Sequence, residues 1–162
     1  MGLGNPHCGD DALGIVLARG LQRHGFGQVS FAGIDLERWL RADAILPGRQ
    51  VVFLDAVEIR SAPGTVVLLD ADQVRTRFPQ VSTHRLALGM VARLAIQKGA
   101  TQVWLLGIQP ESLHQPGLSP VVQQSVDLLL ELLVRLSTST RPPLASDRKQ
   151  APFAVAAPPL AL

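Results

Sequence analysis

Three short apolar runs constrain the fold of this chain more than any other feature. Residues 51–57 read VVFLDAV, residues 65–70 read TVVLLD, and residues 102–108 read QVWLLGI. Continuous apolar runs of this length are typical of strands that are buried on both faces. The sequence therefore predicts a sheet that is covered by helices on both sides.

The link between the first two runs indicates their relative direction. It reads EIRSAPG, residues 58–64, and is too short for the crossover helix that joins parallel neighbours. We therefore expect the runs 51–57 and 65–70 to be antiparallel neighbours in the sheet.

Helical spacing of apolar residues predicts the covering layers. The expected helices are 10–24, 36–45, 84–99 and 119–136, and the last has Ser119 as its N-cap and Pro120 at its first position. Residues 28–33 are a further predicted strand. Residues 1–3 form a strand that is either a stub or lacks a segment upstream, and we favour the missing segment. This order predicts a three-layer α/β domain with a mixed sheet.

Length and composition bound the classes of protein. The 162 residues suit one domain, residues 1–136, followed by a Ser-, Pro- and Ala-rich tail over 137–162 that we expect to be disordered. The net charge is +2, and the basic residues are scattered, which disfavours nucleic-acid binding. Cys8 is the single cysteine, so no intrachain disulfide can form. With no signal peptide or membrane span visible, we expect a cytoplasmic monomer.

The opening residues MGLGNPHCGDDALG predict a bent loop that presents carboxylates. A dinucleotide fingerprint is excluded because His7 stands where its last glycine is required. A P-loop is excluded because no Gly-Lys-Ser/Thr follows. Asp10 and Asp11 at the start of the next helix would also repel a phosphate.

Candidate metal ligands follow from the expected topology. Asp11 lies near the carboxyl end of the first strand, Asp55 at the end of the third, and His84 at the start of the helix after the fourth. Sites of open α/β sheets lie at the carboxyl ends of the strands, so these three side chains can converge there. Two carboxylates and an imidazole suit Mn, Fe, Ni or Zn.

Each of these residues also has an ordinary structural explanation. Asp10 alone suits the positive end of a helix dipole, Asp55 alone can cap a turn, and His84 alone can be a helix N-terminal residue. Three other histidines and Cys8 show no catalytic pattern and are expected to be surface or plain loop residues: His7, His24 and His114. Spacing alone therefore leaves a metal site and an acid–base site both open.

Four segments together resemble the hydrogenase maturation proteases. GLGNPHCGDDALG is similar to the family signature G-x-G-N-x-x-x-x-D-[DE]-x-x-G, and LDAVEIRSAPGTVVLL to its D-A-…-P-G-T segment. STHRLAL is similar to its S-x-H-x-x-x-L segment, and LLGIQPESL…GLSPVV to its G-I-x-P-E…G-L-[ST]-P segment. The segments occur in the family's order between residue 1 and about residue 136.

The resemblance implies a fold, an activity and a site. The fold is an α/β/α sandwich whose five-stranded mixed sheet has one antiparallel strand. The activity is removal of a C-terminal extension from the large-subunit precursor of [NiFe] hydrogenase after nickel insertion. The family's metal-contacting residues fall on Asp11, Asp55 and His84, which recognise nickel that the substrate already holds, so no resident metal is expected. The substrate cleft is expected at five further residues: Gly4, Asn5, Gly107, Pro110 and Glu111.

One departure from the family pattern leaves alternatives open. Phe31 stands where many members carry an acidic residue at the end of the second strand, and Asp35 is the nearest carboxylate. A non-catalytic module that binds and checks nickel is therefore an alternative function. A metal-dependent peptidase with its own resident ion is another.

Overall fold

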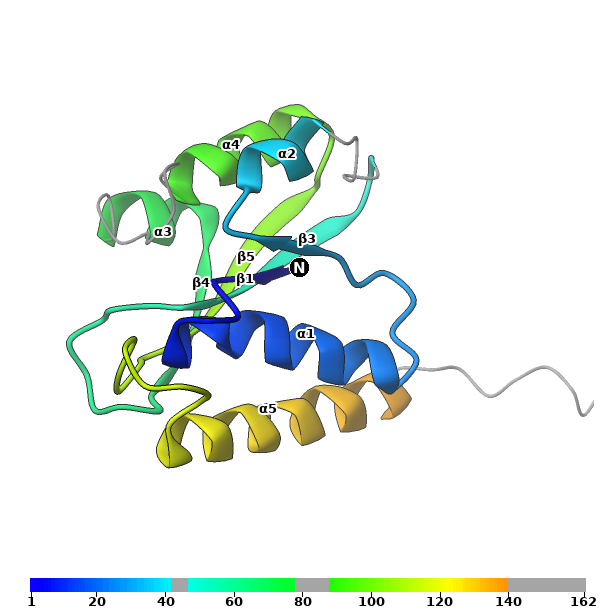
Figure 1. The fold of residues 1–162 in the computed structure, drawn as a ribbon. Coiled ribbons are helices and arrows are strands. Elements are labelled where there is room, and N and C mark those ends of the chain that lie inside the picture. The colour runs from blue at the N-terminus through cyan, green and yellow to red at the C-terminus, as the bar shows by residue number, and fades with distance from the viewer. Residues whose placement is uncertain (42–46, 78–87, 140–162) are drawn as a thin grey trace, which may run out of the picture.

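A five-stranded sheet between two layers of helices forms in the computed structural model, which describes residues 1–41, 47–77 and 88–139 (Figure 1). The strands are β1 (Gly2–Leu3), β2 (Phe31–Gly33), β3 (Gln50–Ala56), β4 (Val66–Asp70) and β5 (Gln102–Ile108). The helices are the 3-10 turn η1 (Gly9–Ala12), α1 (Leu13–Arg23), α2 (Leu36–Arg41), α3 (Ala71–Arg77), α4 (Leu88–Gln97) and α5 (Pro120–Ser139).

The sheet has the order β2-β1-β3-β5-β4, and β4 is antiparallel to β5 while the other pairs are parallel. The predicted α/β/α sandwich with a five-stranded mixed sheet is therefore confirmed. The first strand is two residues long, and Gly2 pairs with Phe31 on one side and Leu54 on the other.

The predicted pairing of the runs 51–57 and 65–70 is wrong, although β4 does run opposite to β3. Strand β5 lies between them and pairs with both, so that Leu106 is level with Leu54 and with Leu68. The connection after β3 therefore spans two strand spacings, about 10 Å, which its residues can reach without a helix. The more buried β5 takes the inner position, while the exposed Val66 and Leu68 lie on the edge strand.

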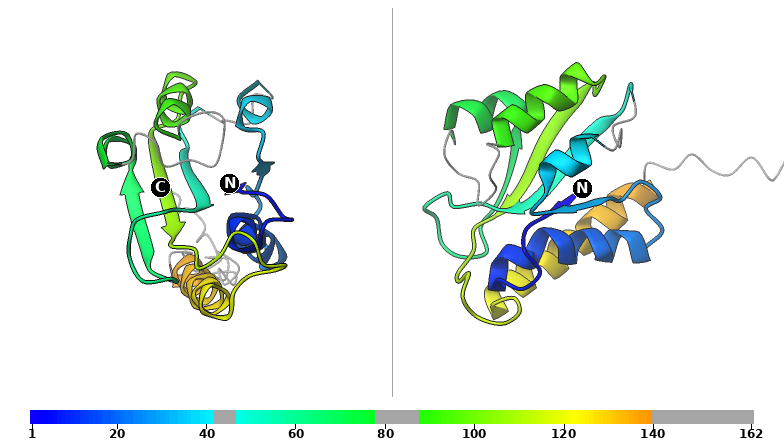
Figure 2. Two further views of the ribbon diagram at one scale, coloured as in Figure 1. Left: turned by 60° about the vertical axis from the view of Figure 1, so that its left-hand side comes forward. Right: turned by 45° about the horizontal axis from the view of Figure 1, so that its top comes forward.

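Helices α2, α3 and α4 cover one face of the sheet, and α1 and α5 cover the other (Figure 2). Successive residues of a central strand alternate between the two cores, as the two-residue period of a strand requires. Phe53 packs with Trp39 of α2 and Val91 of α4, whereas Leu54 packs with Leu17 and Val126 on the opposite side. The strand ends are thereby held between two apolar layers.

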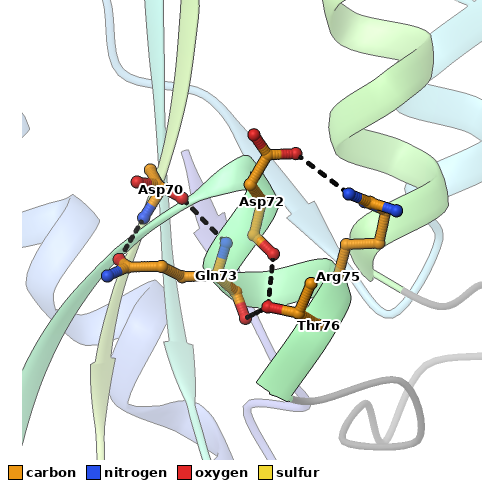
Figure 3. A network of polar contacts seen from close by, with 5 residues as sticks. All are labelled: Asp70, Asp72, Gln73, Arg75 and Thr76. Atoms are coloured by element: carbon orange, nitrogen blue, oxygen red, sulfur yellow. Dashed lines mark hydrogen bonds and ion pairs between the residues drawn. The ribbon is translucent and has the colours of Figure 1, made fainter.

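Helix α3 was not predicted, because the sequence analysis expected no helix or strand over residues 71–77. It begins directly after β4 with a reciprocal capping pair (Figure 3). The backbone N–H of Gln73 donates to Asp70 Oδ1 at 2.8 Å, and the backbone N–H of Asp70 donates to Gln73 Oε1 at 3.1 Å. The Asp-x-x-Gln spacing is the side-chain signal of such a cap, and it was present in the sequence.

The ends of other predicted elements also differ. The predicted helix 10–24 divides into η1 and α1, and the predicted strand 28–33 is shortened to Phe31–Gly33. Helix α5 extends to Ser139, so the first three residues of the predicted tail are helical, and the rest of that tail lies outside the described residues. Residues 42–45 and 84–87 of two predicted helices also lie outside them. None of the helices in the described ranges is long and apolar enough to cross a membrane.

Helix α1 lies directly on the strand backbones because Gly14 has no side chain. A Cβ at this position would stand 2.0 Å from Leu54 O and 2.6 Å from Leu3 O. Both obstacles are backbone atoms of strands, which cannot move aside as a flexible side chain can. The close approach places the start of α1 against the carboxyl ends of β1 and β3.

Gly14→Ala should therefore destabilise the protein by about 3 kcal/mol, the upper part of the usual range for overpacking a core. Urea unfolding monitored by circular dichroism measures this. Gly27→Ala is the matched control, because a Cβ at Gly27 meets nothing within 4 Å, and it should leave the unfolding midpoint nearly unchanged. Equal stability of the two variants would contradict the packing described.

A candidate active site at the carboxyl ends of the strands

Asp11 lies on η1, immediately beyond the carboxyl end of β1. The loop from Gly4 to Cys8 turns sharply enough for the Asn5 N–H to donate to Asp11 Oδ2 at 2.7 Å. Gly4 has a φ of +104°, and a Cβ there would stand 1.7 Å from Asp11 O. Only glycine allows this turn, and the turn holds the Asp11 side chain at 5% exposure.

Asp55 is the second-last residue of β3. It is 2% exposed, and the following Ala56 N–H donates to Asp55 Oδ1 at 2.9 Å. In the sheet it is level with Gly107 of β5. A carboxylate here faces the same end of the sheet as the loop that follows β1.

The two carboxylates approach this edge from elements that are in direct contact. Gly14 of α1 packs on the Leu54 carbonyl; Asp11 precedes Gly14 by three residues, and Asp55 follows Leu54. The third predicted ligand, His84, lies outside the described residues. Among residues 1–41, 47–77 and 88–139, no three His, Cys, Asp or Glu side chains form a group that could hold a metal. The structure thus supplies Asp11 and Asp55 at one edge, and the role of His84 stays a prediction.

Asp10 is fully buried and ties η1 to the loop after β5. The donors to its carboxylate are the N–H groups of Glu111 (2.8 Å), Ser112 (2.9 Å) and Ser119 (2.7 Å) and the Ser119 hydroxyl (3.0 Å). In return, the Asp10 N–H donates to Ser112 O at 2.9 Å. Asp10 is therefore more than a charge at a helix start. Ser119 keeps the predicted N-cap position directly before Pro120, where its carbonyl accepts from the Gln123 N–H at 2.8 Å, while its hydroxyl donates to Asp10.

The hydrogen bonds to Asp10 keep its carboxylate ionised. Burial disfavours the charged form and alone would raise the pKa, but the backbone N–H groups of Ser112, Ser119 and Glu111 and the Ser119 hydroxyl outweigh it. The net effect lowers the pKa of Asp10 below its ordinary value. A buried carboxylate that accepts several N–H bonds is stable as an anion without a cationic partner.

Gln109 organises the segment that follows Asp55. Its Oε1 accepts from the Ile59 N–H at 2.8 Å, and its Nε2 donates to Glu58 Oε2 at 3.0 Å. The backbone contributes as well, because the Gly64 N–H donates to Gln109 O at 2.9 Å. Arg60 adopts a left-handed φ of +57° within this held segment. Gln109 and Asp10 therefore fix the loop after β5 at different points along its length.

The predicted cleft residues lie at this same edge, with different degrees of exposure. Gly4 is buried, Asn5 and Pro110 are half-buried, and Glu111 is exposed. Gly107 is buried, and a Cβ there would stand 2.5 Å from Val57 Cγ2. Packing therefore accounts for Gly107 by itself, and the contact of these residues with a substrate stays a prediction.

Phe31 and Asp35 belong to β2, the outer strand beside β1, and to the segment that follows it. Phe31 is 41% exposed and is the first residue of β2, so its predicted place at the end of the second strand is wrong; that strand ends at Gly33. Asp35 caps α2, because its Oδ1 accepts from the Arg38 N–H at 2.9 Å. The observed bond gives Asp35 a structural role. His7, His24 and His114 are exposed as expected, and Cys8 is half-buried.

Sequence reasoning did not find the roles of Asp10 and Gln109. Both residues lie within the segments that were singled out, next to Asp11 and before Pro110. What identifies them is burial together with bonds across about a hundred residues of sequence or fifty. A second aspartate and a glutamine in otherwise glycine- and proline-rich segments were the signal that could have indicated them.

Comparison with known proteins gives one consistent result. A family model described as hydrogenase maturation protease matches residues 42–136. Two solved structures are similar over most of their length: the hydrogenase maturating endopeptidase HybD from E. coli, and the [NiFe] hydrogenase maturation protease HycI from Thermococcus kodakarensis. The first is 26% identical with a TM-score of 0.70 and covers 86% of this chain and 91% of its own. The second is 27% identical with a TM-score of 0.73 and covers 85% and 89%.

A protein of Methanocaldococcus jannaschii that is named as a candidate hydrogenase maturation protease is also similar. It is 24% identical over 84% of this chain and 85% of its own length. The two structures and this relative each cover 84–86% of this chain, whereas the family model begins at residue 42, after η1 and Asp11.

Asp10 should make the stability depend on pH in the acid range. Because its pKa is lower in the folded than in the unfolded chain, its contribution is complete above the unfolded value and is lost as the pH falls through the folded value. Urea unfolding between about pH 6 and about pH 3 should therefore show a smaller acid loss for Asp10→Asn than for the wild type.

The same variant should be less stable near neutral pH, by on the order of 3 kcal/mol, because several buried donors lose their acceptor. Asp72→Asn is the control, since the side chain of Asp72 is 87% exposed and, among the residues that the structure describes, is paired only with the exposed Arg75. If the stabilities of the wild type and Asp10→Asn fall in parallel with pH, Asp10 is not the source of the acid dependence of stability.

Proposed function

Since this chain belongs to the hydrogenase maturation protease family, and so is a peptidase of hydrogenase maturation, we propose that its substrate is the large-subunit precursor of a [NiFe] hydrogenase. The reaction is removal of the precursor's C-terminal extension after nickel has been inserted. The observation that carries this proposal is the pair of buried carboxylates, Asp11 and Asp55, at the edge of the sheet where α/β proteins bind ligands.

The chemistry follows from what peptide hydrolysis requires. A scissile carbonyl must be polarised and a water must be activated, and a divalent ion can do both. Nickel that arrives within the precursor takes oxygen ligands from Asp11 and Asp55 and a nitrogen ligand from His84. A neutral imidazole is available near pH 7, because the ordinary pKa of histidine lies just below it. Oxygen and nitrogen ligands of this kind suit nickel.

Substrate recognition is then coupled to metal loading. A precursor without nickel gives Asp11 and Asp55 no ion to bind, so the scissile bond is not held at the site. The loop that carries Gly4 and Asn5 and the loop with Pro110 and Glu111 are both bonded to η1, through Asp11 and Asp10 respectively. In this proposal the C-terminal segment of the precursor lies along these two loops as an extended chain.

The direct experiment incubates the purified protein with the precursor from the same organism, either nickel-loaded or nickel-free, and determines the mass of the large subunit. The nickel-loaded precursor should be shortened, and the nickel-free precursor should stay intact. No shortening in either case would indicate a binding module without catalysis. Shortening of both, together with stoichiometric metal in the protein by elemental analysis, would indicate a peptidase with a resident ion.

Asp11→Asn, Asp55→Asn and His84→Ala should each lower the rate of this shortening by about 100-fold or more, since each removes a group that contacts the metal directly. Asp127→Asn is the matched control, because Asp127 is exposed on α5 and bonds only Gln123 among the interactions described. Its rate should equal that of the wild type. Full activity of both Asp11→Asn and His84→Ala would overturn the site assignment.

A further inference from the structure

Asp10 makes no contact that would let it bind an ion at the surface, because both of its oxygens are occupied inside the protein. Oδ1 accepts from the Ser119 N–H, and Oδ2 accepts from the N–H groups of Glu111 and Ser112 and from the Ser119 hydroxyl. The side chain is 0% exposed. Whatever Asp10 does for the reaction, it does through the two segments that it joins.

These two segments are the ones that carry the candidate site. Asp10 is the residue before Asp11 on η1, and its partners Glu111 and Ser112 follow Pro110 in the loop after β5. Their backbones are also in direct contact. A Cβ at Gly9 would stand 2.6 Å from Ser112 O and 2.9 Å from Gln115 O. The carboxylate of Asp10 thus fixes the position of η1 relative to the loop.

Short hydrogen-bonded links then fix the position of Asp11. The Asp11 N–H donates to Cys8 O at 3.0 Å, and Asp11 Oδ2 accepts from the Asn5 N–H. Asp10 and Asp11 are consecutive residues of the four-residue η1, so a displacement of Asp10 also displaces Asp11. The Asn5 N–H therefore reports on where the Asp11 carboxylate lies.

We propose that Asp10 is a positioning residue of the peptidase: by clamping η1 to residues 111–119, it holds the Asp11 carboxylate at a fixed place relative to the loop that borders the substrate. This inference rests on the proposed function. Asp10 itself touches neither the nickel of the precursor nor the scissile bond. An ionised carboxylate is required, because asparagine in its place has one acceptor oxygen and would turn its NH₂ group toward backbone donors.

The test measures kcat and KM for cleavage of nickel-loaded precursor by the full chain, in the wild type, Asp10→Asn and Ser119→Ala. Asp10→Asn should lower kcat about 30-fold with KM changed less than about threefold, because misplacement of a reacting group by about 1 Å is costly while the binding surface persists. Ser119→Ala removes a single donor and should lower kcat by about threefold. Asp72→Asn, an exposed carboxylate on α3, is the control and should match the wild type.

A second readout does not require activity. Amide hydrogen exchange followed by nuclear magnetic resonance should show faster exchange at Asn5 in Asp10→Asn, while Leu105 and Leu106 in the centre of β5 stay as protected as in the wild type. Unchanged exchange at Asn5, or kcat within threefold of the wild type, would overturn the positioning role. If Asp10→Asn does not fold, Ser119→Ala decides by the exchange at Asn5 alone: faster exchange than in the wild type supports the positioning role, and unchanged exchange overturns it.

The two proposals fail in different ways. A wild-type protein that leaves nickel-loaded precursor intact refutes the proposed function, and the exchange at Asn5 still decides whether Asp10 fixes Asp11. A wild-type protein that cleaves, together with an Asp10→Asn variant that cleaves equally well, refutes only the positioning role.

Discussion

The hydrogen bonds to the Asp10 carboxylate are the interaction on which the arrangement of the site depends. A charge without contact with water is costly unless protein donors replace its hydration shell. Here the donors are three backbone N–H groups and one hydroxyl, all from the loop after β5. Two segments that are a hundred residues apart in the sequence are thereby fixed to each other, and the neighbouring Asp11 is fixed with them.

Adjacent aspartates of the same chemical type therefore have different roles. Asp10 is surrounded by donors from its own chain and stabilises the fold as an anion. Asp11 is placed by the turn at Gly4 and by the close contact of Gly14 with Leu54, at the edge where Asp55 also lies. Close backbone packing and internal hydrogen bonding thus prepare the edge of the sheet, and the proposed nickel-dependent cleavage uses the carboxylates that this packing places there.

The fold could be predicted from the sequence where a local pattern determines it. The apolar runs at 51–57 and 102–108 identified the central strands, and the short link after the first of them indicated the antiparallel direction of β4. The pattern could not show that β5 lies between β3 and β4, because strand order is decided by which strand gains most from burial on both edges. Asp11 and Asp55 could be placed at the strand ends from topology, whereas the role of Asp10 depends on contacts with Ser112 and Ser119 that no local pattern encodes.

The proposed function depends on the binding of nickel, presented by another protein, to Asp11 and Asp55. X-ray absorption at the nickel edge, recorded on nickel-loaded precursor alone and on its complex frozen before turnover, tests this most directly. The nickel should gain oxygen ligands when the wild-type protein binds, and should gain none when the protein carries both Asp11→Asn and Asp55→Asn. A nickel spectrum that is the same in the free precursor and in the wild-type complex would contradict the account.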